Sequence, residues 1–179
     1  MKATGIVRRI DDLGRVVIPK EIRRTMRIRE GDPLEIYTDS NGEVIFKKYS
    51  QIGELVLFIN QYTEVLNKSA GHPVIVCDKD HVIAAAGLPK REILERRISS
   101  ALEDIMENRN TYIYNADVTP LQPIEGVDKY CLVAMPIISS GDFTGSIMFI
   151  DNDTNINISE TDIRLIEVAA VFLGKEMEE

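Results

Sequence analysis

A short basic segment, residues 12–27, constrains the fold of this chain more than any other feature. Its β-branched run 16–18 lies between a turn glycine, Gly14, and Pro19. Proline suits the first turn of a helix, because its φ is already helical and the N–H that it lacks would be unpaired there. The segment therefore predicts a turn, a short strand, and a helix that begins at Pro19 and continues to about Ile28.

The predicted helix carries its basic residues on one face. The spacing i, i+3, i+4 and i+7, which one side of a helix requires, is that of Lys20, Arg23, Arg24 and Arg27. Glu21 is the one acidic residue in the predicted helix, so these cations repel each other unless a polyanion neutralises them. An ordinary solvated face is the alternative interpretation. Together with Arg9 from the preceding strand, the face predicts a surface that binds an anionic polymer.

The net charge of −8 hides a strong asymmetry along the chain. Residues 1–29 contain nine Lys or Arg against three Asp or Glu, whereas residues 51–179 contain ten against 21. A polyanion responds to the local charge that it meets, so the overall acidity does not exclude nucleic acid as a partner. The acidic remainder favours solubility and disfavours nonspecific wrapping of DNA.

The first 50 residues predict a small ββαββ unit. Its predicted strands are residues 4–10, 16–18, 34–37 and 44–46. The dipeptide Asn41-Gly42 predicts a tight hairpin turn between the last two strands. A unit of this size is marginally stable alone and leaves strand edges uncovered. We therefore expect two chains to exchange strands and form a dimer.

The residues of this unit resemble the AbrB family of swapped-hairpin transition-state regulators. The resemblance runs without a gap over roughly the first 48 residues and includes the core Gly14-Arg15-Val16-Val17-Ile18-Pro19. In that family two chains interleave their hairpins into one barrel and present arginines to DNA. The resemblance implies a β-dominated barrel formed by a dimer. The DNA-binding positions that it implies are Arg8, Arg15, Arg23 and Arg24.

Residues 51–68 predict an amphipathic helix that links this unit to the rest of the chain. Its apolar residues follow the 3, 4, 3, 4 spacing of a heptad seam, and so do those of a second helix near the C-terminus. The predicted seam residues are Ile52, Leu55, Ile59, Tyr62, Leu66, Ile163, Ile166 and Leu173. Such seams either join chains, which would assemble two DNA-binding dimers into a tetramer, or pack the helices onto their own domain.

Residues 51–179 predict an α+β domain with a central antiparallel sheet and flanking helices. Its predicted elements are strands at 74–77, 81–85, 111–114, 130–138 and 143–150, a helix at 92–108, and a last helix capped by Ser159 and Asp162. The element order and the run Val74-Ile75-Val76-Cys77-Asp78 resemble a GAF domain, a small-molecule-sensing relative of PAS domains. AbrB-type heads joined to such a domain resemble transcription regulators of spore-forming bacteria, which implies repression or activation of sporulation genes.

No group of residues in the sequence predicts catalysis. Cys77 and Cys131 lie in apolar strand-like runs, which favours buried, reduced thiols. His72 and His81 have no clustered ligands. Residues 151–162 partly fit a calcium loop, but isoleucine replaces the required glycine, so a polar turn is favoured. We therefore expect no enzyme, no metal and no cofactor.

The whole sequence predicts a cytoplasmic, sequence-specific DNA-binding transcription regulator. The expected domains are residues 1–50, which bind DNA, and residues 51–179, which regulate or oligomerise. The expected partners are double-stranded DNA, further copies of the chain and, if the second domain is a sensor, a small molecule. A membrane helix needs ~20 apolar residues, and no such run is present. The alternative is an antitoxin that autoregulates through the same fold, although antitoxin tails are usually disordered.

Overall fold

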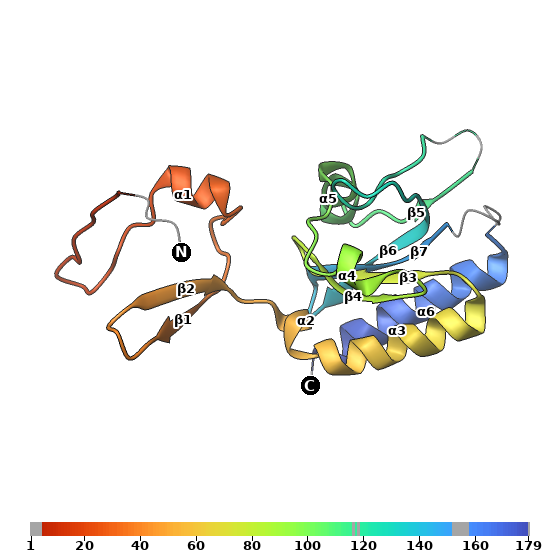
Figure 1. Ribbon diagram of the computed structural model, residues 1–179, viewed down its shortest axis with the longest axis horizontal. Helices are drawn as coiled ribbons and strands as arrows, with labels where there is room; N and C mark the ends of the chain where they lie inside the picture. The colour runs from red at the N-terminus through yellow and green to blue at the C-terminus, as the bar shows by residue number, and fades with distance from the viewer. Residues whose placement is uncertain (1–4, 116, 118, 152–157, 179) are drawn as a thin grey trace. The chain divides into compact units, whose positions relative to one another are not determined.

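The chain divides into two compact units, Met1–Tyr49 and Ser50–Glu179. The computed structural model describes residues 5–115, 117, 119–151 and 158–178 (Figure 1).

The first unit contains one short helix and one hairpin. Helix α1 spans Lys20–Thr25, and strands β1 (Leu34–Thr38) and β2 (Val44–Lys48) pair antiparallel. The Asp39 carboxylate accepts hydrogen bonds from the backbone N–H groups of Asn41 and Glu43, and Gly42 has a φ of 81°. Local turn chemistry therefore closes this hairpin where the Asn-Gly signal predicts it.

The predicted strands at residues 4–10 and 16–18 do not form in the single chain. The described residues 5–10 and 15–18 have no strand hydrogen bonds to another segment. A strand needs a neighbour to pair with its backbone groups. The prediction of two further strands is therefore wrong for one chain alone, where the hairpin β1–β2 is the unit's described sheet.

The described residues of the first unit, 5–49, form no apolar core of their own. Among its described residues Pro19 alone is buried. Its largest apolar side chains remain in solvent, with Val7 88% exposed, Val17 71% exposed and Ile36 62% exposed. Apolar burial is the main favourable term in folding, so one copy of this unit lacks the contacts that stabilise a fold.

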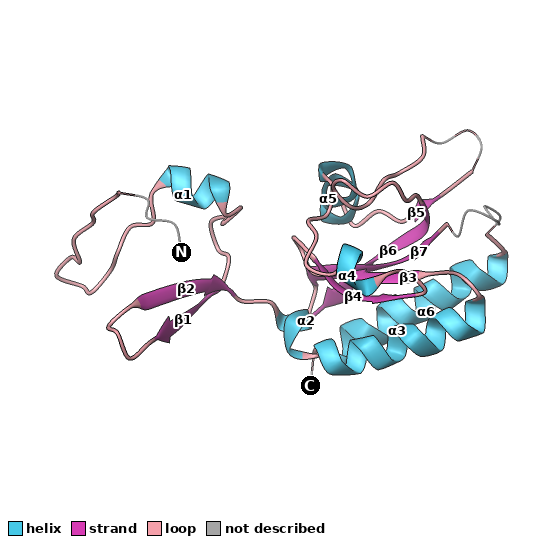
Figure 2. Cartoon of the chain, viewed as in Figure 1, coloured by secondary structure: helices cyan, strands magenta, loops and turns pink. Residues whose placement is uncertain are grey.

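The second unit is built on a five-stranded antiparallel sheet of order β4-β3-β7-β6-β5 (Figure 2). Its strands are β3 (Val74–Cys77), β4 (Val82–Ala86), β5 (Tyr112–Ile113), β6 (Cys131–Ser139) and β7 (Asp142–Ile150). Helices α3 (Val56–Ala70) and α6 (Glu160–Glu176) pack on one face. The short helices α4 (Lys90–Ile93) and α5 (Ser100–Glu107) cover the other.

Alternate residues of β7 feed the two cores, as the period of a strand requires. Ile147 and Phe149 belong to the core under α3 and α6, whereas Met148 and Ile150 belong to the core under α4 and α5. A strand covered on both faces reads as a continuous apolar run, and this is the pattern of the buried half of β7, Ile147–Ile150.

Two predicted helices are divided in the structure. The helix expected at 51–68 consists of α2 (Gln51–Glu54) and α3, separated at Leu55, and it packs on the second unit rather than acting as a free linker. The helix expected at 92–108 is interrupted between α4 and α5. Glu95 has a φ of 62°, and its N–H donates to the carbonyl of Val82, so this segment follows the edge of β4.

Helix α6 begins and packs through two specific residues. Its N-cap is Ser159, which forms the predicted capping box with Asp162. Near its C-terminal end, Gly174 is buried against the end of β6, and a Cβ placed there would lie 2.2 Å from the carbonyl oxygen of Ile138. Glycine therefore allows the helix backbone to approach the strand backbone closely.

Candidate nucleic-acid interface

The turn before the basic helix is fixed by Asp11. One carboxylate oxygen of Asp11 accepts from the backbone N–H groups of Leu13, at 3.0 Å, and Arg15, at 2.8 Å. The other forms an ion pair with Nε of Arg15 at 2.8 Å. These bonds to Arg15 are the main reason why the pKa of Asp11 lies below its ordinary value. Gly14, at a φ of 76°, supplies the left-handed residue of the turn.

Helix α1 presents its cations to solvent. Lys20, Arg23 and Arg24 are all exposed, and the two arginines lie in the last turn, where positive charge interacts favourably with the helix dipole. Pro19 occupies the N-cap position, so the helix begins at Lys20, one residue later than predicted. Arg8 and Arg9, in the extended segment before the turn, are also exposed.

Arg27 lies beyond the helix and not on its basic face. The helix ends at Thr25, and Arg27 has a φ of 50°, which stops the helical repeat. The Ile28 N–H donates to the carbonyl of Arg23 at 2.7 Å, which closes the helix in the manner of a Schellman motif. The predicted four-residue face is therefore wrong in its last member, because the helix is too short to reach position i+7.

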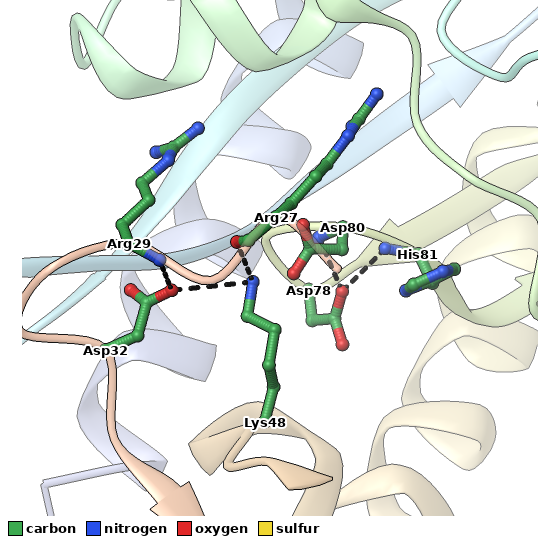
Figure 3. A network of polar contacts seen from close by, with 7 residues as sticks. All are labelled: Arg27, Arg29, Asp32, Lys48, Asp78, Asp80 and His81. Carbon is green, nitrogen blue, oxygen red and sulfur yellow. Dashed lines mark hydrogen bonds and ion pairs between the residues drawn. The ribbon is translucent and has the colours of Figure 1, made fainter. Parts of the chain in front are cut away.

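A lysine from the hairpin holds this helix end in place. Nζ of Lys48 donates to the carbonyl oxygen of Arg27 at 3.1 Å and lies 3.7 Å from the Asp32 carboxylate (Figure 3). The same carboxylate accepts from the backbone N–H of Arg29 at 2.8 Å. Lys48 therefore holds the loop after α1 against strand β2. Neither Lys48 nor Asp11 was predicted from the sequence, although the Asx-turn chemistry of Asp11 was a usable signal.

The predicted seam residues face the core of their own domain. Five of them, Ile52, Ile59, Leu66, Ile166 and Leu173, are at most 6% exposed. The remaining three, Leu55, Tyr62 and Ile163, are partly buried and pack against the same core. Side chains that already contact their own sheet are not available to a second chain. The 3, 4 spacing therefore reports the inner side of α3 and α6, as the single-domain alternative had it.

A different apolar surface lies on the outer side of these two helices. We call it the α3–α6 patch, and its exposed members are Leu57, Val65, Val168, Val171 and Phe172. The ring of Phe172 lies 5.5 Å from that of Tyr62 and 6.0 Å from that of Phe58, measured between centroids. Contiguous exposed apolar residues of this kind mark interaction surfaces.

The other candidate groups have structural surroundings. Cys77 and Cys131 are buried free thiols, as predicted, and burial raises the pKa of both. His72 is buried with Nε2 3.7 Å from the Asp162 carboxylate. The described residues contain no cluster of three potential metal ligands, and half of the weak calcium-loop match, residues 152–157, lies outside them. Among them, no helix has the length and apolarity needed to cross a bilayer.

Comparisons with known proteins connect both units to transcription regulators. Residues 54–178 match the family model "Stage V sporulation protein T C-terminal, transcription factor", and residues 7–54 match the model of the MazE bacterial antitoxin. The chain is 48% identical to stage V sporulation protein T of Bacillus subtilis over 181 residues, covering 100% of both chains.

Two solved structures are similar to the separate units. The N-terminal DNA recognition domain of Bacillus subtilis AbrB is 62% identical over 28% of this chain and 92% of that one, with a TM-score of 0.25. A GAF domain/HD domain protein from Geobacter sulfurreducens is 13% identical over 74% of this chain and 99% of that one, with a TM-score of 0.53. The second likeness shows a GAF-type fold for the second unit. On the full-length match, the chain belongs to the stage V sporulation protein T family of transcription regulators.

Proposed function

We propose that this transcription regulator of sporulation genes binds double-stranded DNA through a dimer of its first unit. The observation that carries the proposal is the combination, in residues 5–49, of exposed cations with the lack of an apolar core among the described residues. The 62% identity to the DNA recognition domain of AbrB supports the same reading.

Dimerisation follows from the apolar side chains that one chain leaves in solvent. Val7, Ile10, Val17 and Ile36 are each more than 60% exposed. Burying a side chain of this kind contributes about 1.5–3 kcal/mol, so four in each chain supply a substantial driving force for association. A second copy also supplies strand partners for residues 5–10 and 15–18, which complete the predicted barrel.

The mechanism of binding is electrostatic docking followed by base readout. The arginines proposed to contact DNA are Arg8, Arg15, Arg23 and Arg24, and Arg9 and Lys20 are exposed beside them. Eight arginines in a dimer would neutralise ~8 phosphates, which gives a slope of roughly −7 for log K against log salt. A guanidinium that reaches guanine contributes ~1–3 kcal/mol of discrimination against the wrong base. The set is complete only when two chains contribute it.

The second unit is proposed to join two such dimers through the α3–α6 patch. Its exposed apolar residues lie on the side of the helices opposite the core, so a second domain can pack there without disturbing the sheet. Linking two DNA-binding dimers raises the effective concentration of the second at its site. Native mass spectrometry of the protein from cells would report a tetramer and would also reveal a retained small molecule.

The test of DNA binding is a gel-shift series on a duplex selected by the wild-type protein from a randomised library. Arg15→Ala and Arg23→Ala should abolish the shift while the protein remains a dimer or tetramer by sizing. Arg91→Ala is the matched control, because Arg91 is an exposed arginine of the second unit. Unchanged affinity in either of the first two variants would refute the assignment of that arginine.

An antitoxin is the second candidate, because residues 7–54 match the MazE model. That function needs a segment that binds a toxin. Residues 50–179 form a domain with two apolar cores and not an extended tail. Circular dichroism of full-length protein together with limited proteolysis tests the point: a second unit that is cleaved as fast as an unfolded chain would favour the antitoxin.

A further inference from the structure

One carboxylate fixes both the backbone and the side chain of a proposed DNA-binding arginine. Asp11 accepts from the Arg15 N–H at 2.8 Å through Oδ1 and from Arg15 Nε at 2.8 Å through Oδ2. The Asp11 N–H in turn donates to the Arg15 carbonyl at 3.1 Å. The guanidinium is thus attached to the turn that carries it, although 69% of the Arg15 side chain remains exposed.

The ion pair with Asp11 engages Nε of Arg15 and not the two terminal nitrogens of the guanidinium. The ion pair engages Nε, the donor nearest the chain, whereas bidentate contact with guanine O6 and N7 needs a pair of guanidinium donors. The two terminal nitrogens supply such a pair. A side chain that is held before binding loses less conformational entropy when it binds.

The charge of Asp11 weakens the binding of nonspecific DNA. Sequence-independent affinity comes from the release of counterions by unpaired cations on phosphates. A carboxylate paired with Arg15 removes part of that contribution and repels nearby phosphates. Among the described residues, Arg15 is the one of the four matched arginines for which the structure shows an ion pair with an acid.

We propose that Asp11 is a positioning residue that sets the discrimination of the protein between its selected sites and other DNA. This inference rests on the proposed function, because it assigns a task to a neighbour of Arg15 within the same site. Asp11 need not touch DNA. It orients the guanidinium for base contact and lowers the affinity of the surface for phosphates alone.

Asp11→Asn in the full-length protein separates these roles. Asparagine keeps an oxygen that can accept from the Leu13 and Arg15 N–H groups, but it removes the charge and weakens the contact with Nε. The readout is the ratio of dissociation constants for a shuffled duplex and for the library-selected duplex, each measured across a salt series. We expect the variant to bind the shuffled duplex more tightly than the wild type does and with a steeper salt dependence. The ratio of the two dissociation constants should fall about tenfold, which is within the range for losing one bidentate contact.

The control is Asp12→Asn, because Asp12 is an exposed carboxylate next to Asp11 in the sequence and its replacement removes the same charge. This variant should bind both duplexes more tightly and leave the ratio of their dissociation constants unchanged. In an Arg15→Ala background, measured at low salt where the remaining cations still bind both duplexes, Asp11→Asn should no longer change the ratio, since the side chain that Asp11 orients is gone. Circular dichroism and sizing confirm that each variant is folded and assembled.

The outcomes separate this inference from the proposed function. If Arg15→Ala binds the selected duplex as the wild type does, the proposed role of Arg15 fails and the role of Asp11 fails with it. If Arg15→Ala loses binding but Asp11→Asn keeps the wild-type ratio, or matches Asp12→Asn, only the positioning role of Asp11 is overturned. A lower ratio in Asp11→Asn, absent in the Arg15→Ala background, supports it.

Discussion

Replacing Gly174 by alanine is expected to destabilise the second unit, against the ordinary effect of that change. In an exposed helix interior, glycine to alanine gains about 1 kcal/mol, because alanine loses less backbone entropy on folding. Here the added Cβ would lie 2.2 Å from the carbonyl oxygen of Ile138 and 3.2 Å from its carbonyl carbon. Both neighbours are backbone atoms of β6, so no flexible side chain can move away to make room.

The magnitude follows from how far the helix must move. An ordinary contact between carbon and oxygen is at least about 3 Å, so α6 must shift by roughly 1 Å or bend away from β6. Such a shift loosens the packing of Ala170 and Leu173 against the sheet. Overpacking of a core costs about 1–3 kcal/mol and occasionally more. Because both clashing atoms are backbone atoms, we take the upper part of that range, about 2–3 kcal/mol, and expect a net loss of about 1–2 kcal/mol after the helix-propensity gain of about 1 kcal/mol is subtracted. For a unit of this size the melting temperature should fall by about 3–8 °C.

Thermal unfolding of the full-length protein, followed by circular dichroism, measures this effect. Thr161→Ala is the control, because Thr161 is exposed in the first turn of the same helix and its replacement changes helix propensity without adding an atom. The control should unfold within about 2 °C of the wild type. If Gly174→Ala unfolds at the same temperature as the wild type or above it, the close approach of α6 to β6 is not what requires the glycine.

Four further outcomes follow from the structure. Cys77 and Cys131 should resist alkylation at pH 8 in the native protein and react in urea, because burial raises the pKa of both thiols; mass spectrometry counts the adducts. Val171→Lys should convert the proposed tetramer into dimers in native mass spectrometry without lowering the helix content, since it places a charge in the exposed α3–α6 patch. Arg27→Gly should stabilise the first unit by about 1 kcal/mol in chemical denaturation, because glycine adopts the positive φ without strain. The hydrogen bonds from the Arg15 N–H and guanidinium lower the pKa of Asp11, so the stability that they contribute is complete above the ordinary value of 3.8 and is lost only as pH falls through the lower folded value. The affinity for DNA in gel shifts should therefore be constant from pH 8 to pH 5.

Local chemistry accounts for what the sequence predicts well. The hairpin β1–β2 needs only its own Asp39, Asn41 and Gly42, and the start of α6 needs only Ser159 and Asp162. Neither depends on a distant partner, so a pattern of neighbours is sufficient to identify them. The GAF-like order of elements in the second unit is also readable, because strands such as β3 and most of β6 are apolar runs bounded by turn residues.

The failures arise where distant contacts decide. The predicted strands at residues 4–10 and 16–18 find no pairing partner in the described part of one chain, and a sequence pattern does not say where the partner of a strand lies. A 3, 4 repeat identifies the buried side of a helix but not what buries it. The spacing of Ile59 and Ile166 would be the same whether they contacted a second chain or, as here, their own sheet. The division of the helix at 92–108 depends on Glu95, whose positive φ is imposed by pairing with the edge of β4. The end of α1 depends similarly on Lys48.

The proposed dimer of the first unit would make the folding of that unit a second-order reaction. Because Pro19 is the one buried residue among those described in this unit, the folded head of the proposed dimer would be a product of two chains, and its amount would rise with the square of their concentration at low abundance. A second unit that folds by itself and holds chains together converts that step into a first-order closure. Early in synthesis the cell would thus contain folded second units before it contains DNA-reading heads. The onset of regulation would be a threshold in protein concentration, set by how tightly the α3–α6 patches associate.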